Sequence, residues 1–256
     1  MDRQELLDRF DLTDRVAIVT GGSRGIGEAI VEGFAAVGAK VVVASRKAEA
    51  CQAVADKVNA NGGTALAVPT HMGDLDQLEA LVATTVDAFG GVDVVINNAA
   101  NPLAQPLGSQ TPEAWQKSFD VNLRGPVFLV QNALPHLRAS AHAAVVNVVT
   151  AGVFTTGAFL SMYVAGKSAL VSMTRSMAAE FAGDGIRVNA LAPGSVDTHM
   201  TRATTPAMQE AMVRSQLIPR MAEPLEMVHG ALLLASDAGS FMTGQVLVVD
   251  GGMTVH

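Results

Sequence analysis

Residues 16–30 read VAIVTGGSRGIGEAI, an apolar run followed directly by a glycine-rich segment. The run is rich in β-branched residues and apolar almost throughout, which predicts a strand that is buried on both faces. Gly21, Gly25 and Gly27 predict a tight turn that opens a helix. Backbone N–H groups on such a turn can approach a pyrophosphate, and the helix N-terminus favours its charge. A glycine trio alone more often marks only a turn, but its place after the first strand favours a nucleotide site.

The same alternation of strand and helix continues along the chain. Further apolar β-branched runs lie at 40–45, 64–69, 92–97, 144–149, 186–192 and 245–250. Between them apolar residues recur at helical spacing, as at Leu78, Leu81 and Val82 before Gly90. Buried strands that alternate with helices predict an α/β fold. We expect one doubly wound Rossmann-type domain over residues 1–256, with a mostly parallel seven-stranded sheet flanked by helices.

The composition limits the classes of partner. Of the 256 residues 49% are hydrophobic and 16% charged, and the net charge is −7 with no run of Lys or Arg. Nucleic acid and an anionic membrane surface are therefore not expected as partners. The single cysteine, Cys51, permits no intramolecular disulfide, and the sequence shows neither a secretory signal nor a membrane-spanning apolar run. We expect a cytoplasmic protein and, because the six histidines lack ligand spacing, no metal site.

The end of the second predicted strand bears on the choice of cofactor. In dinucleotide-binding folds an acidic residue there bonds the adenosine 2′-hydroxyl of NAD. This chain instead has Ser45, Arg46 and Lys47, and Arg24 lies in the glycine turn. Two guanidinium groups fit a 2′-phosphate, which favours NADP(H) over NAD(H). The alternative is that both arginines are solvated surface residues.

A tyrosine and a lysine four residues apart, Tyr163 and Lys167, lie in a segment of helical spacing. On a helix the two side chains share one face, about 6 Å apart along the axis. An ammonium at roughly 4 Å would lower the pKa of a phenol by about three units, toward a working pH. By itself the pair is a weak motif, and a buried helix with an incidental Tyr and Lys is the simpler interpretation.

Several motifs occur together along the chain. They are TGGSRGIG (20–27), NNAA (97–100), DVNLRG (120–125), YVAGK (163–167), APGSVDT (192–198) and TGQVLVVDGG (243–252). In this order and spacing they closely resemble the short-chain dehydrogenase/reductase superfamily, and the resemblance covers residues 10–253. It implies reversible hydride transfer between NADP(H) and a ketone, an aldehyde or a secondary alcohol.

The resemblance also assigns roles to individual residues. Tyr163 is the acid/base on the substrate oxygen, and Lys167 lowers its pKa and bonds the nicotinamide ribose. Thr150 stands where the family usually has a serine that holds the substrate oxygen, and Asn122 matches an asparagine that holds a water of the proton relay. The implied cofactor-binding residues are Gly21, Ser23, Arg24, Gly25, Ile26, Gly27, Ser45, Arg46, His71, Met72, Asn98, Tyr163, Lys167, Pro193, Gly194, Val196 and Thr198.

Three positions depart from the family pattern. Ala100 replaces the glycine of the common NNAG, which we expect to be a mild change. His71 and Met72 replace a common acid and valine, and His71 is either an adenine contact or a loop histidine. Thr150 keeps a hydroxyl that donates and accepts as a serine's does, so we expect it to function in place of serine. Its methyl restricts χ1 and takes room beside the substrate.

Residues 198–224 form the segment that covers the substrate in this family. Its methionines favour a lipophilic substrate, unless they pack a helix pair or a subunit contact. These are Met200, Met208, Met212 and Met221.

Two other functions stay open. Reduction of 3-ketoacyl groups on a carrier or thioester is the runner-up, although only Arg138 and His142 offer positive charge to an acidic carrier. A catalytically weak NADP(H)-binding regulatory protein is the other. The helices expected at 113–138 and 160–182 are apolar over more of their circumference than a solvated helix needs. With the family resemblance they predict a homotetramer, with a dimer as the second choice.

Overall fold

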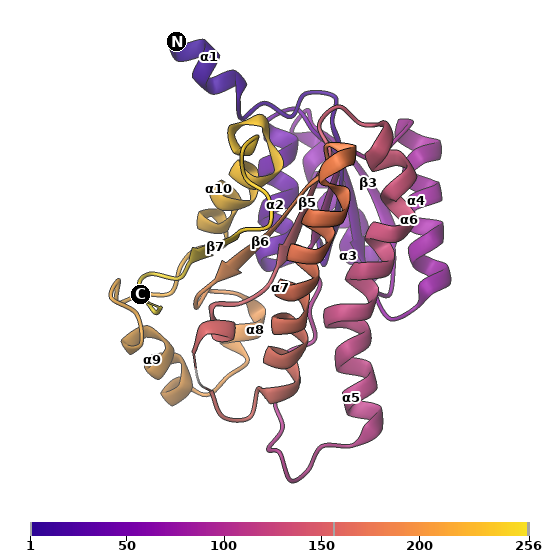
Figure 1. Cartoon of the computed structure of the whole chain (residues 1–256). Helices are drawn as coiled ribbons and strands as arrows, with labels where there is room; N and C mark the ends of the chain where they lie inside the picture. Colours follow the sequence, from indigo (N-terminus) through magenta and orange to yellow (C-terminus); the bar gives the residue numbers. More distant parts are fainter. Residues whose placement is uncertain (1, 156, 255–256) are drawn as a thin grey trace.

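In the computed structural model, which describes residues 2–155 and 157–254, the seven predicted apolar runs form one sheet (Figure 1). The strands are β1 (Val16–Thr20), β2 (Lys40–Ser45), β3 (Thr64–Pro69), β4 (Val94–Asn97), β5 (Ala144–Val148), β6 (Arg187–Pro193) and β7 (Val246–Val249). Their order is β3-β2-β1-β4-β5-β6-β7, and each pairing between these described strands is parallel. The predicted doubly wound α/β fold is confirmed.

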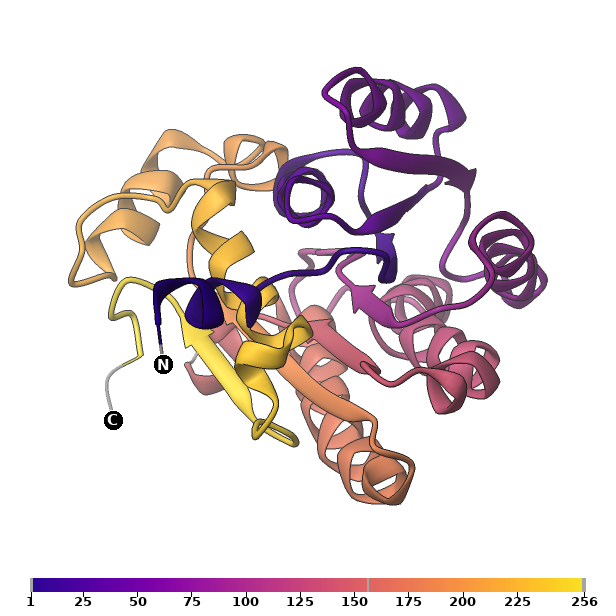
Figure 2. The same cartoon turned by 90° about the horizontal axis from the view of Figure 1, so that it is seen from above.

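Helices cover both faces of the sheet. The α-helices in the described residues of the chain are α1 (Arg3–Asp8), α2 (Gly25–Ala36), α3 (Ala48–Ala60), α4 (Leu75–Phe89), α5 (Pro112–Phe119), α6 (Gly125–Ala139), α7 (Ser161–Phe181), α8 (His199–Arg202), α9 (Pro206–Arg214) and α10 (Pro224–Ala235). Helices α2, α3 and α10 pack on one face, and α4, α6 and α7 pack on the other (Figure 2). None of these helices is long and apolar enough to cross a membrane.

The two layers of helices explain why the strands are apolar throughout. Along β1, Ala17 and Val19 pack into the core beneath α2, α3 and α10, whereas Ile18 packs into the core beneath α4, α6 and α7. All three residues are fully buried. Because successive side chains of a strand point to opposite faces, a sheet covered on both sides requires apolar residues at every position.

Several helix ends match the sequence signals. Helix α4 ends at Gly90, whose φ of 88° lies in the left-handed region that favours glycine. Helix α5 begins after Thr111, whose hydroxyl accepts a hydrogen bond from Ala114 N–H at 3.2 Å. These signals were readable from sequence because a cap is satisfied within one turn of the chain.

The strand order places a topological switch point between β1 and β4. From β1 the sheet grows through β2 and β3 on one side, and through β4 to β7 on the other. The connections on the two sides diverge there, leaving a crevice at the carboxyl ends of the strands. The motifs that follow β1, β4, β5 and β6 all lie at this edge.

The helix expected over 113–138 is interrupted, which corrects the sequence interpretation. Residues Asp120–Arg124 form a π-helical segment between α5 and α6. Within it, Asn122 accepts a hydrogen bond from Asn101 N–H at 3.0 Å and donates to Asn101 O at 2.9 Å. The apolar periodicity of the segment gives no sign of this pairing, because Asn101 lies in a loop 21 residues away in sequence.

Candidate active site

The glycine turn between β1 and α2 has no room for larger side chains. A Cβ on Gly27 would lie 2.2 Å from Gly21 O and 2.4 Å from Asn98 Nδ2, so only glycine fits there. Gly21 and Gly25 have φ values of 65° and 59°, in the region where side chains are strained. The backbone can therefore turn sharply enough to present its N–H groups at the start of α2.

The N-terminus of α2 lacks a side-chain cap. Arg24 is its N-cap residue and makes no capping hydrogen bond, whereas Asp74 and Thr111 cap α4 and α5. Uncapped N–H groups at a helix N-terminus suit an anion such as a pyrophosphate. Of the other residues predicted here, Ser23 is half-buried and Ile26 packs partly against the core beneath α2.

Asn98 and Thr20 hold the glycine turn in place. Asn98 Nδ2 donates to Thr20 O at 2.9 Å and to Gly21 O at 3.3 Å. The Thr20 hydroxyl oxygen accepts from the N–H groups of Asn98 and Ala99, at 3.0 and 3.1 Å. Sequence analysis missed Thr20; its signal is a hydroxyl at the last position of an otherwise apolar strand. Asn98 thus supports the turn on which a cofactor would lie.

The two arginines predicted to select the cofactor flank one contact. Gly22 N–H donates to Ala44 O at 3.3 Å, joining the glycine turn to the end of β2. Arg24 and Arg46 each lie two residues beyond this contact, and both are exposed. Neither is in an ion pair within the described part of the chain. Ser45 is half-buried at the strand end.

The segment after β6 approaches the glycine turn. A Cβ on Gly25 would lie 3.2 Å from Thr198 Cγ2, so Thr198 reaches the start of α2. At the strand end, a Cβ on Gly194 would lie 2.6 Å from Asp250 Cα, so glycine is required there too. Val196 forms an isolated parallel bridge with Ala222, which closes the base of the segment between them. Pro193 is the last residue of β6.

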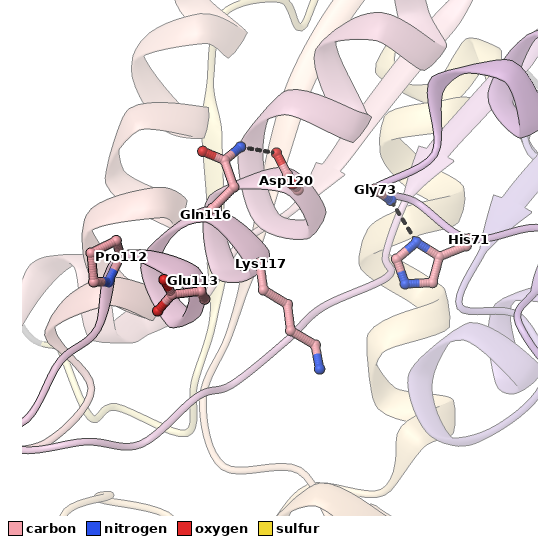
Figure 3. Close-up of a pocket in the computed structure, with 7 residues that line it drawn as sticks. All are labelled: His71, Gly73, Pro112, Glu113, Gln116, Lys117 and Asp120. Carbon is pink, nitrogen blue, oxygen red and sulfur yellow. Dashed lines mark hydrogen bonds between the residues drawn. The ribbon is translucent and has the colours of Figure 1, made fainter.

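His71 borders a groove, whereas Met72 is buried. The Met72 side chain is 5% exposed and packs in the core beneath α4, α6 and α7, leaving only its backbone available to a ligand. His71 Nδ1 accepts a hydrogen bond from Gly73 N–H at 3.0 Å, which places the proton of a neutral ring on Nε2. The groove, about 610 Å³, lies between this loop and α5 (Figure 3). Its lining consists of His71, Gly73, Pro112, Glu113, Gln116, Lys117 and Asp120, so it lies apart from Tyr163 and Lys167.

The structure brings Thr150, Tyr163 and Lys167 together. Thr150 follows β5, and its side chain is hydrogen-bonded to the half-buried Tyr163 of α7. Gly152 N–H donates to Thr150 Oγ1 at 3.1 Å, which leaves the threonine proton free to be donated. Lys167 Nζ, one turn along α7, donates to Val148 O at 2.7 Å. Strand β5 therefore fixes both hydroxyl and ammonium at its carboxyl end.

Asn122 lies against α7 beside this group. It is fully buried, and its Cβ would lie 3.3 Å from a Cβ placed on Gly166, the residue before Lys167. Its amide also donates to Ser118 Oγ at 3.2 Å. The side chain is thus held by protein partners on both sides of its amide.

Comparison with known proteins agrees with this geometry. A family model described as Enoyl-(Acyl carrier protein) reductase matches residues 21–254. The 2,5-dichloro-2,5-cyclohexadiene-1,4-diol dehydrogenase of Sphingobium indicum is 39% identical over 249 residues, covering 95% of this chain and 98% of that protein. The cis-4-hydroxycyclohexanecarboxylate dehydrogenase of Sinomonas cyclohexanicum is 38% identical over 243 residues, or 94% of this chain and 97% of that protein.

A solved structure is also similar over nearly the full length. The dehydrogenase/reductase from Sinorhizobium meliloti 1021 superposes with a TM-score of 0.93 at 31% identity, over 98% of this chain and 100% of that chain. The chain belongs to the short-chain dehydrogenase/reductase superfamily. The family resemblance of the motifs is confirmed. This short-chain dehydrogenase/reductase is therefore an oxidoreductase that uses a nicotinamide cofactor, NAD(P)(H).

The pKa values in this short-chain dehydrogenase/reductase correct the sequence estimate. Burial raises the pKa of Tyr163 to about 12, against a smaller lowering by the hydrogen bond from Thr150. Burial lowers the pKa of Lys167 to about 7. The estimate assumed a permanent ammonium that lowers the phenol pKa, but desolvation opposes charge on both groups and outweighs their attraction. At neutral pH the phenol is protonated.

The residues Cys51, Trp115 and Ala100 have ordinary structural surroundings. The Cys51 thiol is fully buried in α3 and donates to Ser45 O at 3.4 Å. Trp115 stacks on Phe119 of its own helix, with ring centroids 4.8 Å apart. Ala100 does not have a positive φ, since Asp14 and Phe159 are the non-glycine residues with positive φ in the described chain. Within the described residues no group of His, Cys, Asp and Glu could hold a metal ion.

Proposed function

We propose that this protein is an NADP(H)-dependent oxidoreductase in which Tyr163 exchanges a proton with the oxygen of a ketone, an aldehyde or a secondary alcohol. The observation that supports it is the hydrogen-bonded pair of Thr150 and Tyr163, with Lys167 one turn away on the same helix. A hydroxyl pair of this kind can hold one oxygen atom and supply its proton.

The protonation states suit reduction at neutral pH. The nicotinamide, when bound, supplies the hydride that reaches the carbonyl carbon. Tyr163, with a pKa raised to about 12, keeps its proton until negative charge develops on the substrate oxygen, and then transfers it. Thr150 donates a hydrogen bond to the same oxygen. The phenolate left behind is stabilised when Lys167 takes up a proton, because opposite charges attract strongly in a buried site.

The preference for NADP(H) is supported by the charges at the end of β2. Arg24 and Arg46 are exposed, and each is two residues from the contact that joins the glycine turn to β2. Guanidinium groups bind phosphate through charge-assisted hydrogen bonds. The first acid after the strand, Glu49, is in the first turn of α3, past the position that bonds a free 2′-hydroxyl.

A lipophilic, cyclic substrate is supported by two independent observations. Met200 and Met208, in the segment proposed to cover the substrate (198–224), are 43% and 49% exposed. Flexible methionines can adapt to an irregular apolar molecule. The two relatives described above are named for dehydrogenation of hydroxyl groups on six-membered carbon rings.

Reduction of 3-ketoacyl groups is the second candidate, because the matching family model is described as an Enoyl-(Acyl carrier protein) reductase, a name that also refers to acyl groups on a carrier. The positive charges that would attract an acidic carrier are already paired. Arg138 Nε lies 2.8 Å from Asp184 Oδ2, and His142 Nδ1 lies 3.2 Å from Asp237 Oδ1. Paired surface charges attract a partner weakly, so this candidate ranks below the first.

A substrate screen tests the proposed function. NADPH oxidation is followed with cyclic ketones, aliphatic ketones, aldehydes and 3-ketoacyl thioesters, and Tyr163→Phe is the control. We expect turnover of cyclic ketones that Tyr163→Phe abolishes. Tight NADPH binding with no turnover of any carbonyl would instead favour the regulatory protein.

We also propose a homotetramer. The outer face of α7 exposes small side chains at Ala165, Ser168 and Ser172, on which a second helix can pack closely. Strand β7 is an edge of the sheet, and Phe241 beside it is 104% exposed. Light scattering at micromolar concentration is expected to give four times the chain mass. A mass near that of one chain, 26.5 kDa, contradicts the proposal.

A further inference from the structure

Strand β5 and helix α7 are joined by three polar contacts in an otherwise apolar interface. Two of them belong to the proposed catalytic group: Tyr163 bonds Thr150, and Lys167 bonds Val148 O. The third is deeper: Asn147 Nδ2 donates to Thr174 Oγ1 at 2.9 Å. The residues Leu170 and Val171 between these contacts are buried and apolar. We call the three contacts the β5–α7 ladder.

The deepest contact of the β5–α7 ladder is anchored on both sides. Asn147 and Thr174 are both 0% exposed. Asn147 Oδ1 accepts from Asn97 Nδ2 of β4 at 2.8 Å, so its amide is fixed within the sheet. The Thr174 hydroxyl donates to Leu170 O at 2.8 Å, so its lone pairs are aimed away from its own helix. With its proton used, this hydroxyl can only accept from Asn147.

Apolar contacts alone define the position of a helix along a strand less sharply than a hydrogen bond does. One residue of helix spans 1.5 Å, whereas an N–H···O bond is lost within about half an ångström of its optimum. Buried amide N–H groups without a partner are costly, so the pair has one favoured position. That position determines where Tyr163, three turns nearer the start of α7, stands beside Thr150.

We propose that Asn147 and Thr174 are positioning residues, whose hydrogen bond sets the axial position of α7 on β5 and so places Tyr163 against Thr150. The expected effect on turnover rests on the proposed function. The expected effect on the phenol pKa is independent of the proposed function, because it can be measured without substrate.

Helix α4 offers a matched control. Thr85 is also 0% exposed, and its hydroxyl donates to Leu81 O at 2.7 Å, as Thr174 donates to Leu170 O. No hydrogen bond from a strand to the Thr85 hydroxyl occurs in the described residues. Thr85→Val therefore removes the same buried hydroxyl from a helix without breaking a link to the sheet. Thr174→Ser keeps the hydroxyl and removes only a methyl.

The experiment has two readouts. The first is kcat on the best substrate: Thr174→Val should lower it by up to about a hundredfold, the effect of a displacement near 1 Å, while KM for NADPH is unchanged. The second is the ultraviolet titration of the phenol, which reports Tyr163 alone because the chain has one tyrosine. In Thr174→Val we expect its pKa to move from about 12 toward 10 as water reaches the ring. The titratable and charged side chains of α7 besides Tyr163 are Lys167, Arg175 and Glu180, and the substitution leaves all three unaltered.

The controls separate positioning from general damage. Thr174→Ser and Thr85→Val should keep the wild-type kcat and phenol titration, and the unfolding midpoint of every variant is measured alongside. Equal losses in Thr85→Val and Thr174→Val, or a Thr174→Val variant with wild-type kcat and titration, would overturn the inference. If Thr174→Val does not fold, Thr174→Ala and Thr85→Ala make the same comparison. A Tyr163→Phe variant that retains full turnover would contradict the proposed function. The phenol titration would still test the role of the β5–α7 ladder.

Discussion

The cofactor end and the chemical end of this crevice are built in opposite ways. At the glycine turn the decisive features are close backbone packing and exposed charge: Gly27 has no room for a Cβ, and Arg24 and Arg46 are exposed. At the end of β5 the decisive feature is burial: Lys167 is 1% exposed, and Tyr163 is hydrogen-bonded to Thr150 beneath it.

The difference decides which physical term dominates each region. Exposed arginines keep their charge and act on a phosphate by electrostatic attraction that salt can screen. The half-buried Tyr163 and the buried Lys167 are governed by desolvation, which raises the pKa of Tyr163 and lowers that of Lys167. Substitutions at the chemical end should therefore change turnover, and those at the cofactor end should change affinity.

Tyr163→Phe should have the largest effect. It preserves shape and packing but removes the proton, and loss of a general acid typically lowers turnover by about 10²–10⁴-fold. NADPH affinity, measured by fluorescence titration, should be unchanged because the glycine turn is untouched. A variant that binds NADPH far more weakly would show that the two ends are not separate.

Thr150→Val should follow. It removes the hydroxyl that holds the substrate oxygen, and loss of one such donor lowers turnover by about 10²–10³-fold. Thr150→Ser keeps the hydroxyl and should remain within roughly tenfold of wild type. Wild-type turnover in Thr150→Val would mean that another group holds the oxygen.

Arg46→Ala should act on affinity alone. Loss of one charge-assisted phosphate contact costs about 1.5–3 kcal/mol, so NADPH binding should weaken tens-fold while NADH binding and kcat are nearly unchanged. Arg3→Ala is the control for net charge, because Arg3 lies on α1, which projects from the body of the molecule (Figure 1). If the wild-type protein binds NADH as tightly as NADPH, the proposed preference for NADPH is wrong.

The smallest expected effect is on the pH dependence of stability, and Lys167→Met is the variant that measures it. Between pH 7 and 10.5 the unfolded chain holds a proton on Lys167 that the folded chain lacks, because burial lowers the pKa of Lys167 to about 7. The free energy of unfolding should therefore rise with pH in this window, by at most about 1.4 kcal/mol per pH unit. Tyr163 acts in the opposite direction above pH 10, where only the unfolded phenol ionises.

Denaturant unfolding at a series of pH values from 7 to 10 measures this slope. The difference between wild type and Lys167→Met isolates the lysine, since other groups titrate alike in both. A pH-independent difference would show that Lys167 keeps its proton in the folded protein.

Much of the architecture was predictable because its causes are local. The run 16–19 is apolar at every position, as expected of a strand covered on both faces, and Gly21 to Gly27 fix a turn within seven residues. Thr111 and Gly90 mark helix ends through hydrogen bonds or dihedrals of their own turn. Tyr163 and Lys167 share a helix face by spacing alone.

The contacts and burial that the sequence did not predict depend on segments that are far apart in the chain. The π-helical segment at Asp120–Arg124 carries Asn122, which pairs with Asn101, and Met72 is buried in a core that residues of α4, α6 and α7 share. The predicted lowering of the Tyr163 pKa was wrong for the same reason, because burial by distant segments raises that pKa.

By itself the sequence determined the fold class, the place of the glycine turn and the identity of the side chains at the crevice. Hydrophobic periodicity and glycine sterics act over a few residues and can be read from order alone. Only the tertiary structure decided that Tyr163 is protonated, that Lys167 is desolvated and that α7 is tied to β5 through Thr174. Desolvation and hydrogen-bond partners depend on which distant segments surround a group, and that arrangement exists only after the sheet has assembled.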